Sequence, residues 1–323
     1  MDLKTIYSPI KGDLAAVEGE FGRLSAKWHD TFPQLEEMLS HSLIGGKALR
    51  PALTFIAGRA LGGRRETILP MATANELMHI ATLVHDDAID KADTRRGRLT
   101  VNKLWGLEKA ILLGDFLFAR AGEFAASTDN LEVTKLFSRT LGKISVGELR
   151  QSYSAFSPIQ AMDIYLERIA GKTAALFELS CVSGGILAGA DNVQENALRD
   201  YAHYLGLAFQ IVDDILDFVG TEEELGKPVG SDLRQGTVTL PALLLMERFP
   251  DHNPVRRFLD AGHDPDCVVQ AVEMIKNSTI IDDCYTRATQ YSAKAAASLG
   301  ILPASQAKKA LVSLADYLIK RRN

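Results

Sequence analysis

The sequence predicts an all-α protein, and three observations support that prediction. Prolines are sparse, with none between Pro70 and Pro158 or between Pro158 and Pro228, and an interior proline costs a helix about 3 kcal/mol. Apolar residues recur at the spacing of one helical face over 136–149 and over 205–216. The sequence also lacks runs of alternating β-branched residues bounded by hairpin turns.

The predicted helices are separated by short segments rich in glycine and proline. These segments, which we expect to be loops, lie at 44–46, 61–63, 96–97 and 220–241. Ordinary helix lengths then predict about ten or more helices. Because no linker rich in Ser, Gly or Pro divides the chain, we expect a single domain over residues 1–323.

The composition limits the classes of function. With 46% hydrophobic and 24% charged residues the chain can bury a core, and its net charge of -5 argues against nucleic-acid binding. Cys181, Cys267 and Cys284 fit neither a zinc site nor a disulfide framework, which suits a reducing cytosol. No signal-like or membrane-spanning apolar stretch is present, so we expect a cytoplasmic protein whose greasy product could partition to a membrane.

A first acidic cluster, Asp86, Asp87 and Asp90, follows the apolar segment MHIATLVH. On a helix Asp86 and Asp90 are one turn apart and point the same way, and His79 lies close to the same stripe. Carboxylates at this spacing repel each other, so a hard divalent cation is their natural partner. Magnesium prefers one or two carboxylates together with phosphate oxygens and water, and this cluster therefore predicts a magnesium site.

A second acidic cluster, Asp213, Asp214 and Asp217, follows LAFQIV and repeats this geometry, with Gln210 one turn beneath Asp214. The apolar residues around these acids predict a helix that is buried on most sides. Buried carboxylates need partners, because an unpaired buried charge is very costly.

Acidic pairs are also common on solvated helix faces, and the chain carries one at Asp282 and Asp283, where no third aspartate follows. One D-D-x-x-D motif alone is a weak signal. Two of them, each in an apolar helical stretch, favour a shared chemical role.

Arginines and a lysine follow the two clusters. Arg95 and Arg96 come shortly after the first cluster; such a pair at a helix end could simply favour the helix dipole, or it could grip phosphate bidentately. Lys227 follows the second cluster, in a loop whose glycines would let the backbone approach a ligand.

Further cations occur in two other segments. Lys47 and Arg50 are three residues apart, and we expect them to share one helical face. Lys172 precedes Thr173 in an apolar helical stretch, where a buried lysine needs an anionic partner. Together, the acids and cations suit two diphosphate groups, one reached through metal and one through direct cationic contacts.

With these motifs in order, the chain resembles the trans-isoprenyl diphosphate synthase (polyprenyl synthetase) family over nearly its whole length, and is most like the long-chain octaprenyl and heptaprenyl diphosphate synthases. The segments that carry the resemblance are GGKALRP (45–51), ELMHIATLVHDDAIDKADTRRGRLT (76–100), GDFLFARA (114–121), GELRQ (147–151), GKTAALFELS (171–180) and GLAFQIVDDILDFVGTEEELGKPVGSDLRQGTVTLP (206–241). The resemblance implies an all-α, isoprenoid synthase-like fold, a single large helical bundle around a central cavity, and usually a homodimer.

The resemblance also implies roles for the site residues. Magnesium ions bound by Asp86, Asp90 and Asp213 would hold the allylic diphosphate, with support from Asp87, Asp214 and Asp217. The residues implied to contact that diphosphate are Arg95, Lys172 and Lys227. The residues implied to hold isopentenyl diphosphate are Lys47, Arg50, His79 and Arg96, and those implied to face the carbocation are Thr173 and Gln210.

The implied reaction needs no protein nucleophile. Metals and cations neutralise the leaving diphosphate as its carbon–oxygen bond breaks, and the double bond of isopentenyl diphosphate attacks the allylic cation. Where this chain has Thr237, the family often has a lysine, so one cation is absent near the second cluster.

Product length should depend on the residues beneath the first cluster. Ala81 and Thr82 are small, which predicts an open tunnel and a long product. Phe137 precedes Glu148 by about three turns, roughly 16 Å along a continuous helix, and could form the tunnel floor or be an ordinary core residue. Met78, one turn beneath Thr82, is a second candidate.

We therefore predict an all-trans long-chain polyprenyl diphosphate synthase that acts with magnesium. Three alternatives stay open: a shorter-chain synthase of the farnesyl or geranylgeranyl kind, a non-catalytic subunit of a heteromeric synthase, and a metal phosphohydrolase. The hydrolase would need further histidines, such as His79 and His41, to join His85 at the metal, and it leaves the second cluster unexplained.

Overall fold

A computed structural model describes residues 2–95, 97–157, 159–221, 228–260 and 262–320. Within these ranges the chain is almost wholly helical, and the strands are confined to the two-residue hairpin of β1 (Thr94–Arg95) and β2 (Arg98–Leu99). The all-α prediction is confirmed. The cysteines Cys181, Cys267 and Cys284 are buried free thiols, as expected.

The chain groups into two compact units, each built from separated segments. Unit 1 comprises residues 1–140, 176–200 and 298–314, and unit 2 comprises 141–175, 201–297 and 315–323. Neither unit is one continuous piece of sequence. The expectation of a single domain over residues 1–323 stays a prediction.

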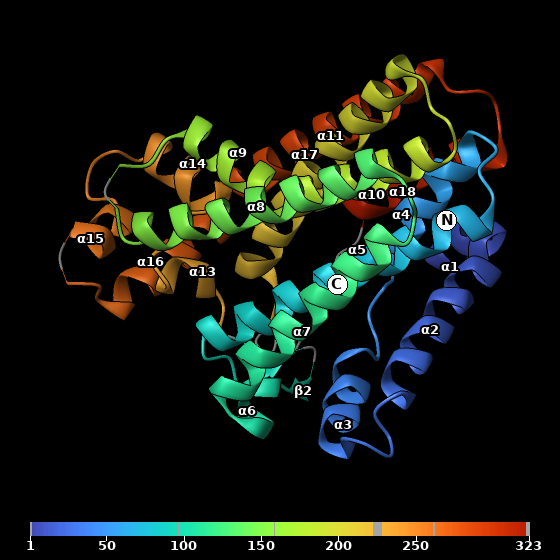
Figure 1. The fold of residues 1–323 in the computed structure, drawn as a ribbon. Coiled ribbons are helices and arrows are strands. Elements are labelled where there is room, and N and C mark those ends of the chain that lie inside the picture. The colour runs from blue at the N-terminus through green and yellow to red at the C-terminus, as the bar shows by residue number, and fades with distance from the viewer. Residues whose placement is uncertain (1, 96, 158, 222–227, 261, 321–323) are drawn as a thin grey trace. The chain divides into compact units, whose positions relative to one another are not determined.

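Unit 1 holds the N-terminal helices and the hairpin (Figure 1). Its complete elements are α1 (Leu3–Tyr7), η1 (Ser8–Ile10), α2 (Lys11–Ala26), α3 (Pro33–Ser42), α4 (Leu49–Ala60), α5 (Arg65–Ile89), β1, β2, α6 (Val101–Trp105), α7 (Leu107–Ala126) and η3 (Leu299–Ile301). It also contains the first part of α8 (Leu131–Ser154), most of α10 (Ala175–Leu187), the first part of α11 (Asn192–Val219) and most of α18 (Gln306–Lys320).

Helix α5 carries the first aspartate cluster at its C-terminal end and packs along α7. The two helices approach closely at Gly114, where a Cβ atom would lie 2.1 Å from Nε2 of His85. A glycine is therefore required on α7 at this point. The same contact leaves the His85 ring bonded to the Ile111 carbonyl on α7 at 3.0 Å.

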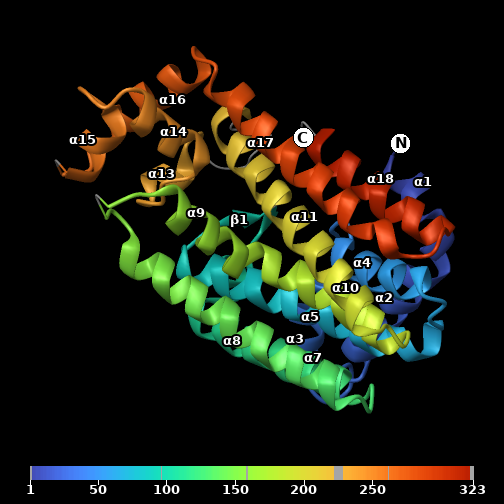
Figure 2. The same cartoon turned by 90° about the horizontal axis from the view of Figure 1, so that it is seen from above.

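Unit 2 contains the remaining parts of α8 and α11 and the helices that follow the second aspartate cluster. Its complete elements are α9 (Met162–Ile169), the π-helix η2 (Ala170–Ala174), α13 (Ser231–Arg234), α14 (Leu240–Arg248), α15 (Pro254–Asp260) and α16 (Pro265–Lys276); α17 (Ile280–Ser298) belongs to it up to residue 297. Figure 2 shows α13–α16 gathered together, and these helices contact one another.

The core of unit 2 forms around the apolar face of α11. Ile211, Val212, Ile215 and Phe218 are buried there, together with side chains from α9, α14 and α16. The helical period that places these residues inward also places Asp214 and Asp217 among the buried side chains. This packing fixes the direction in which each aspartate of the second cluster points.

Candidate active site

In the first cluster the middle aspartate differs from the outer two. Asp87 is buried, and both its carboxylate oxygens accept hydrogen bonds from Nε of Arg95 on the hairpin, at 2.8 and 2.9 Å. Asp86 is half-buried, and Asp90, which caps the C-terminus of α5, is exposed. The two outer carboxylates are thus less buried than the middle one, and their spacing of one helical turn places them on the same side of the helix.

In the second cluster both Asp214 and Asp217 are buried, and Asp213 is half-buried. Asp217 accepts hydrogen bonds from the Ser231 hydroxyl at 3.2 Å and from the Asp232 amide at 3.3 Å. The predicted need of buried carboxylates for partners is therefore met by groups of the protein itself.

Asp214 ends a chain of hydrogen bonds. The Thr173 hydroxyl donates to Oε1 of Gln210 at 2.6 Å, and Nε2 of Gln210 donates to Oδ1 of Asp214 at 2.8 Å. The Tyr165 hydroxyl donates to Oδ2 at 2.7 Å. Burial raises the pKa of Asp214 to about 7, although both hydrogen bonds act to lower it, and burial raises the pKa of Tyr165 well above its usual value.

Tyr165 was missed by the sequence analysis. A signal for it was present, because the buried carboxylates were expected to need partners and α9 is a short amphipathic helix with one tyrosine on its buried face. Residue spacing cannot predict which carboxylate this tyrosine contacts, because the contact depends on how α9 and α11 pack in the tertiary structure.

Lys172 and Thr173 lie in the π-helix rather than in a regular α-helix. Such one-turn π segments often occur at functional sites. Nζ of Lys172 pairs with Glu148 on α8 at 2.8 Å, so the anionic partner expected for this lysine is present within the protein.

Lys47 and Arg50 do not share a helical face, and that expectation is wrong. Helix α4 begins only at Leu49, and Lys47 is exposed on the loop before it. The cause is the backbone of that loop, in which Ala48 is left-handed with φ of 46°. Arg50 lies over the ring of Phe177, 5.5 Å from its centroid.

A pocket of about 410 Å³ in unit 1 brings three of the predicted residues together, His79, Asp87 and Arg95. His41 and Arg98, which the sequence analysis did not assign to a diphosphate site, line the same pocket. Nη2 of Arg98 contacts Nδ1 of His41 at 3.0 Å, and Nε2 of His41 contacts the Leu99 carbonyl at 2.9 Å.

This bonding argues against the hydrolase alternative. His41 is engaged by the hairpin and His85 by α7, so neither ring is directed to a shared metal with His79. Among the described residues, no group of three His, Cys, Asp or Glu side chains converges as a complete metal cage. Carboxylate oxygens are hard ligands of the kind that magnesium takes, one or two at a time, together with phosphate oxygens and water.

The predicted product-length residues occupy buried or half-buried positions. Ala81 is fully buried and Thr82 half-buried on α5, where the Thr82 hydroxyl donates to the His79 carbonyl at 2.8 Å. Phe137 is buried on α8, which is one continuous helix through Glu148. Arg96 and Lys227 lie outside the described residues. No helix within the described ranges is long and apolar enough to cross a membrane.

Comparison with known proteins places this site in a family. A model of the polyprenyl synthetase family matches residues 32–277. Component 2 of the heptaprenyl diphosphate synthase of Geobacillus stearothermophilus is 40% identical over 99% of both chains. The octaprenyl diphosphate synthase of Escherichia coli is 35% identical over 89% of this chain and 90% of its own length.

Solved structures agree. A polyprenyl synthase from Caulobacter crescentus, complexed with calcium and isoprenyl diphosphate, matches with a TM-score of 0.90 and 34% identity over 100% of this chain and 98% of that one. The fold is therefore that of the polyprenyl synthases. The chain belongs to the polyprenyl synthetase family and is a prenyltransferase.

Proposed function

We propose that this chain is an all-trans long-chain polyprenyl diphosphate synthase, which condenses isopentenyl diphosphate onto an allylic diphosphate. The observation that carries the proposal is the pair of D-D-x-x-D clusters on α5 and α11, each with a buried, hydrogen-bonded middle aspartate and outer carboxylates that are less buried in the first cluster. The hepta- and octaprenyl synthases among its relatives support the long product.

The chain's own residues would bind and orient the two substrates. The residues that would contact the allylic diphosphate are Lys172, Arg95 and Lys227. When its diphosphate group leaves, an allylic cation forms, and Thr173 and Gln210 would face that cation. The isopentenyl diphosphate would be held by Lys47, Arg50, His79 and Arg96. Holding the double bond close to the allylic carbon supplies much of the rate, because it replaces a bimolecular encounter.

Asp86, Asp90 and Asp213 would hold magnesium, with Asp87, Asp214 and Asp217 in support. Magnesium would supply positive charge that stabilises the departing diphosphate. The carboxylate donor set supports this choice of metal, because magnesium prefers hard oxygen ligands.

A product assay tests the proposal. Purified protein is incubated with magnesium, farnesyl diphosphate and labelled isopentenyl diphosphate, and the dephosphorylated products are sized by chromatography. A ladder that ends between heptaprenyl and decaprenyl is expected. A stop at geranylgeranyl would keep the reaction and refute the long product inferred from Ala81 and Thr82.

A second candidate is a catalytic or non-catalytic component that needs a different partner chain. One observation favours it, since the Geobacillus relative is named as component 2 of its synthase. Both aspartate clusters are complete in this chain, which supports activity without such a partner. Turnover by the chain alone would decide against this candidate.

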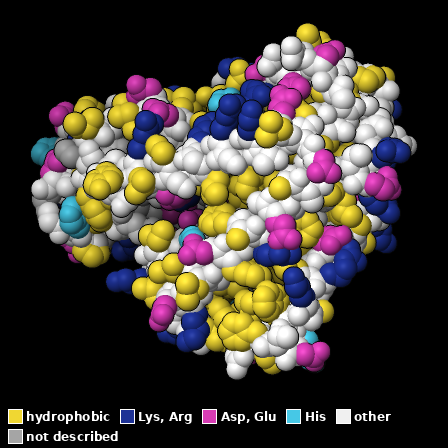
Figure 3. All heavy atoms as spheres, in the orientation of Figure 1, with side chains coloured by type: hydrophobic (Ala, Val, Ile, Leu, Met, Phe, Trp, Pro, Cys, Tyr) yellow, Lys and Arg dark blue, Asp and Glu magenta, His cyan; other side chains and the backbone are white. Residues whose placement is uncertain are grey.

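We also propose that the chain forms a homodimer through the region of α6 and α7. Leu104, Leu107, Ile111 and Leu112 are exposed there, and Figure 3 shows hydrophobic side chains gathered around these helices. Contiguous exposed apolar surface of this kind marks interaction sites. Light scattering of the purified chain should give twice the monomer mass, and Ile111→Glu should reduce it to the monomer mass.

A further inference from the structure

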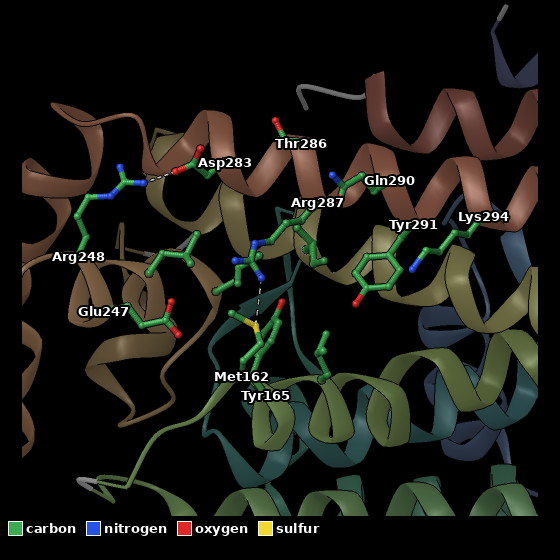
Figure 4. A pocket seen from close by; sticks show the side chains of 14 residues that line it. Met162, Tyr165, Glu247, Arg248, Asp283, Thr286, Arg287, Gln290, Tyr291 and Lys294 are labelled. Carbon is green, nitrogen blue, oxygen red and sulfur yellow. Dashed lines mark hydrogen bonds and ion pairs between the residues drawn. The ribbon is translucent and has the colours of Figure 1, made fainter.

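Tyr165 stands between a second pocket and the second aspartate cluster. The pocket, of about 600 Å³ and wholly within unit 2, is lined by side chains from α9, α11, α14 and α17. Figure 4 shows Tyr165 at its wall, near Met162 and Arg287. The side chain is nevertheless only 2% exposed, and its hydroxyl is directed to Asp214.

For the ionised form of Asp214, hydrogen-bond chemistry sets the role of each neighbour. An ionised carboxylate can only accept, so the nitrogen of Gln210 then faces it and the oxygen of Gln210 faces Thr173. Tyr165 donates to the other carboxylate oxygen. Each carboxylate oxygen of Asp214 therefore accepts one hydrogen bond, Oδ1 from Gln210 on α11 and Oδ2 from Tyr165 on α9.

The Tyr165 ring is itself held in place. The guanidinium of Arg168 lies over it, 5.6 Å from the ring centroid, and donates to the Val238 carbonyl. Because the ring is fixed by packing and the hydroxyl by Asp214, the tyrosine has one orientation. Groups that orient a metal-binding shell in this way are commonly as important as the ligands that they support.

We propose that Tyr165 is a positioning residue for the reaction: it fixes the Asp214 carboxylate and so sets the orientation of the second aspartate cluster. Through Gln210 and Thr173 the same carboxylate links the cluster to the π-helix that carries Lys172. The inference rests on the proposed function, since it gives the second cluster its role in holding magnesium and diphosphate.

The test compares Tyr165→Phe with Tyr291→Phe. Tyr291 lines the same pocket and stacks on Tyr204, with ring centroids 6.2 Å apart. Within the part of the chain that the structure describes, its hydroxyl makes no hydrogen bond. Calorimetry measures the binding of magnesium with inorganic diphosphate, and kinetics measure the magnesium dependence of turnover. Tyr165→Phe should raise the dissociation constant for magnesium with diphosphate, and the magnesium concentration that gives half-maximal turnover, by roughly 10–100-fold each. Tyr291→Phe should match the wild type in both.

A double-mutant cycle separates positioning from general destabilisation. In an Asp214→Ala background, Tyr165→Phe should have little further effect on magnesium–diphosphate binding, because alanine offers the tyrosine hydroxyl no acceptor. Equal binding by Tyr165→Phe and the wild type, or additive losses in the double variant, would overturn the proposal. If Tyr165→Phe alone unfolds, the comparison of Asp214→Ala with the double variant carries the same test.

The binding measurement also keeps this inference separate from the proposed function. A wild-type chain that binds magnesium and diphosphate but elongates nothing would refute the synthase, while the two tyrosine variants would still report on Tyr165. A wild-type chain that binds neither would refute both.

Discussion

At the scale of single residues, the two aspartate clusters share one arrangement. In each, the middle carboxylate is buried and bonded to a side chain from another element, Arg95 for Asp87 and Tyr165 for Asp214. The two partners differ in charge. Asp87 is balanced by a cation, whereas Asp214 receives only neutral donors, and burial raises its pKa to about 7 against the opposing effect of those hydrogen bonds.

That raised pKa predicts how stability depends on pH. Between the ordinary pKa of 3.8 and about 7 the folded protein binds more protons at Asp214 than the unfolded chain does, so stability falls as pH rises through this window. Asp214→Asn removes the effect and keeps hydrogen-bonding groups in place. Without metal, the variant should melt at a higher temperature than the wild type at about pH 8.

Thermal unfolding in a chelator over about pH 4 to 8 makes the measurement. The gap between variant and wild type should close toward the acid end. A gap of constant size across this range would mean that Asp214 titrates normally in the folded state.

At the scale of elements, the hairpin β1–β2 is tied to the loop before α4 by one arginine. Arg98 donates to His41 at the end of α3 at 3.0 Å and reaches the Ile44 carbonyl at 3.4 Å. It thereby joins the two segments that carry Lys47 and Arg95. Residues 43–48 before α4 form a loop, and each strand of the hairpin has only two residues, so neither segment has extended regular structure to hold these cations in place.

Removing this tie should weaken substrate binding more than catalysis. His41→Ala is expected to raise the KM for isopentenyl diphosphate by a factor of roughly 5–30, the equivalent of about 1–2 kcal/mol, with little change in kcat. His29→Ala, which removes an exposed histidine paired with Glu36, is the control. A lowered kcat with unchanged KM would contradict the role of Arg98 as a tie.

The π-helix depends on close packing against α11. A Cβ atom on Gly206 would lie 2.5 Å from Cα and 2.7 Å from Cβ of Ala174, the last residue of the π-helix. Gly206→Ala must displace backbone, and it should cost about 1–3 kcal/mol of stability and lower activity by moving Lys172 and Thr173. Chemical denaturation together with the product assay measures both effects.

Gly142 on α8 provides the matched control. A Cβ atom there would meet nothing within 4 Å, so Gly142→Ala should stabilise the helix by up to about 1 kcal/mol. If the two alanine variants behaved alike, the close approach at Gly206 would have no energetic importance.

The elements were predictable from the sequence to different degrees. The helices around the aspartates follow from local periodicity, which also puts Asp86 and Asp90 on one face of α5. That this face is less buried than Asp87 results from tertiary packing. The loop position of Lys47 does not follow, because it depends on the left-handed backbone at Ala48. The pairings of Lys172 with Glu148 and of Tyr165 with Asp214 join segments that are distant in the sequence. A single sequence does not show which distant segments pack together.

At the scale of the whole molecule, we expect product length to depend on a distance along α8. The helix is continuous from Leu131 to Ser154, so Phe137 lies roughly 16 Å along the helix from Glu148. If Phe137 forms the floor of the product tunnel, Phe137→Ala should lengthen the products by at least one isoprene unit. Chromatography of the dephosphorylated products measures this, and an unchanged ladder would make Phe137 an ordinary core residue.

The interleaving of the two units has a consequence for the biosynthesis of the chain. Unit 1 takes its last segment from residues 298–314, where Leu311 and Leu314 are buried. When residues 1–297 have emerged from the ribosome, all of α2 to α7 has been synthesised, but unit 1 still lacks its last segment. The N-terminal half must wait, with apolar surface uncovered, for the final helix to be translated, and that interval is when such a chain is most in need of a chaperone.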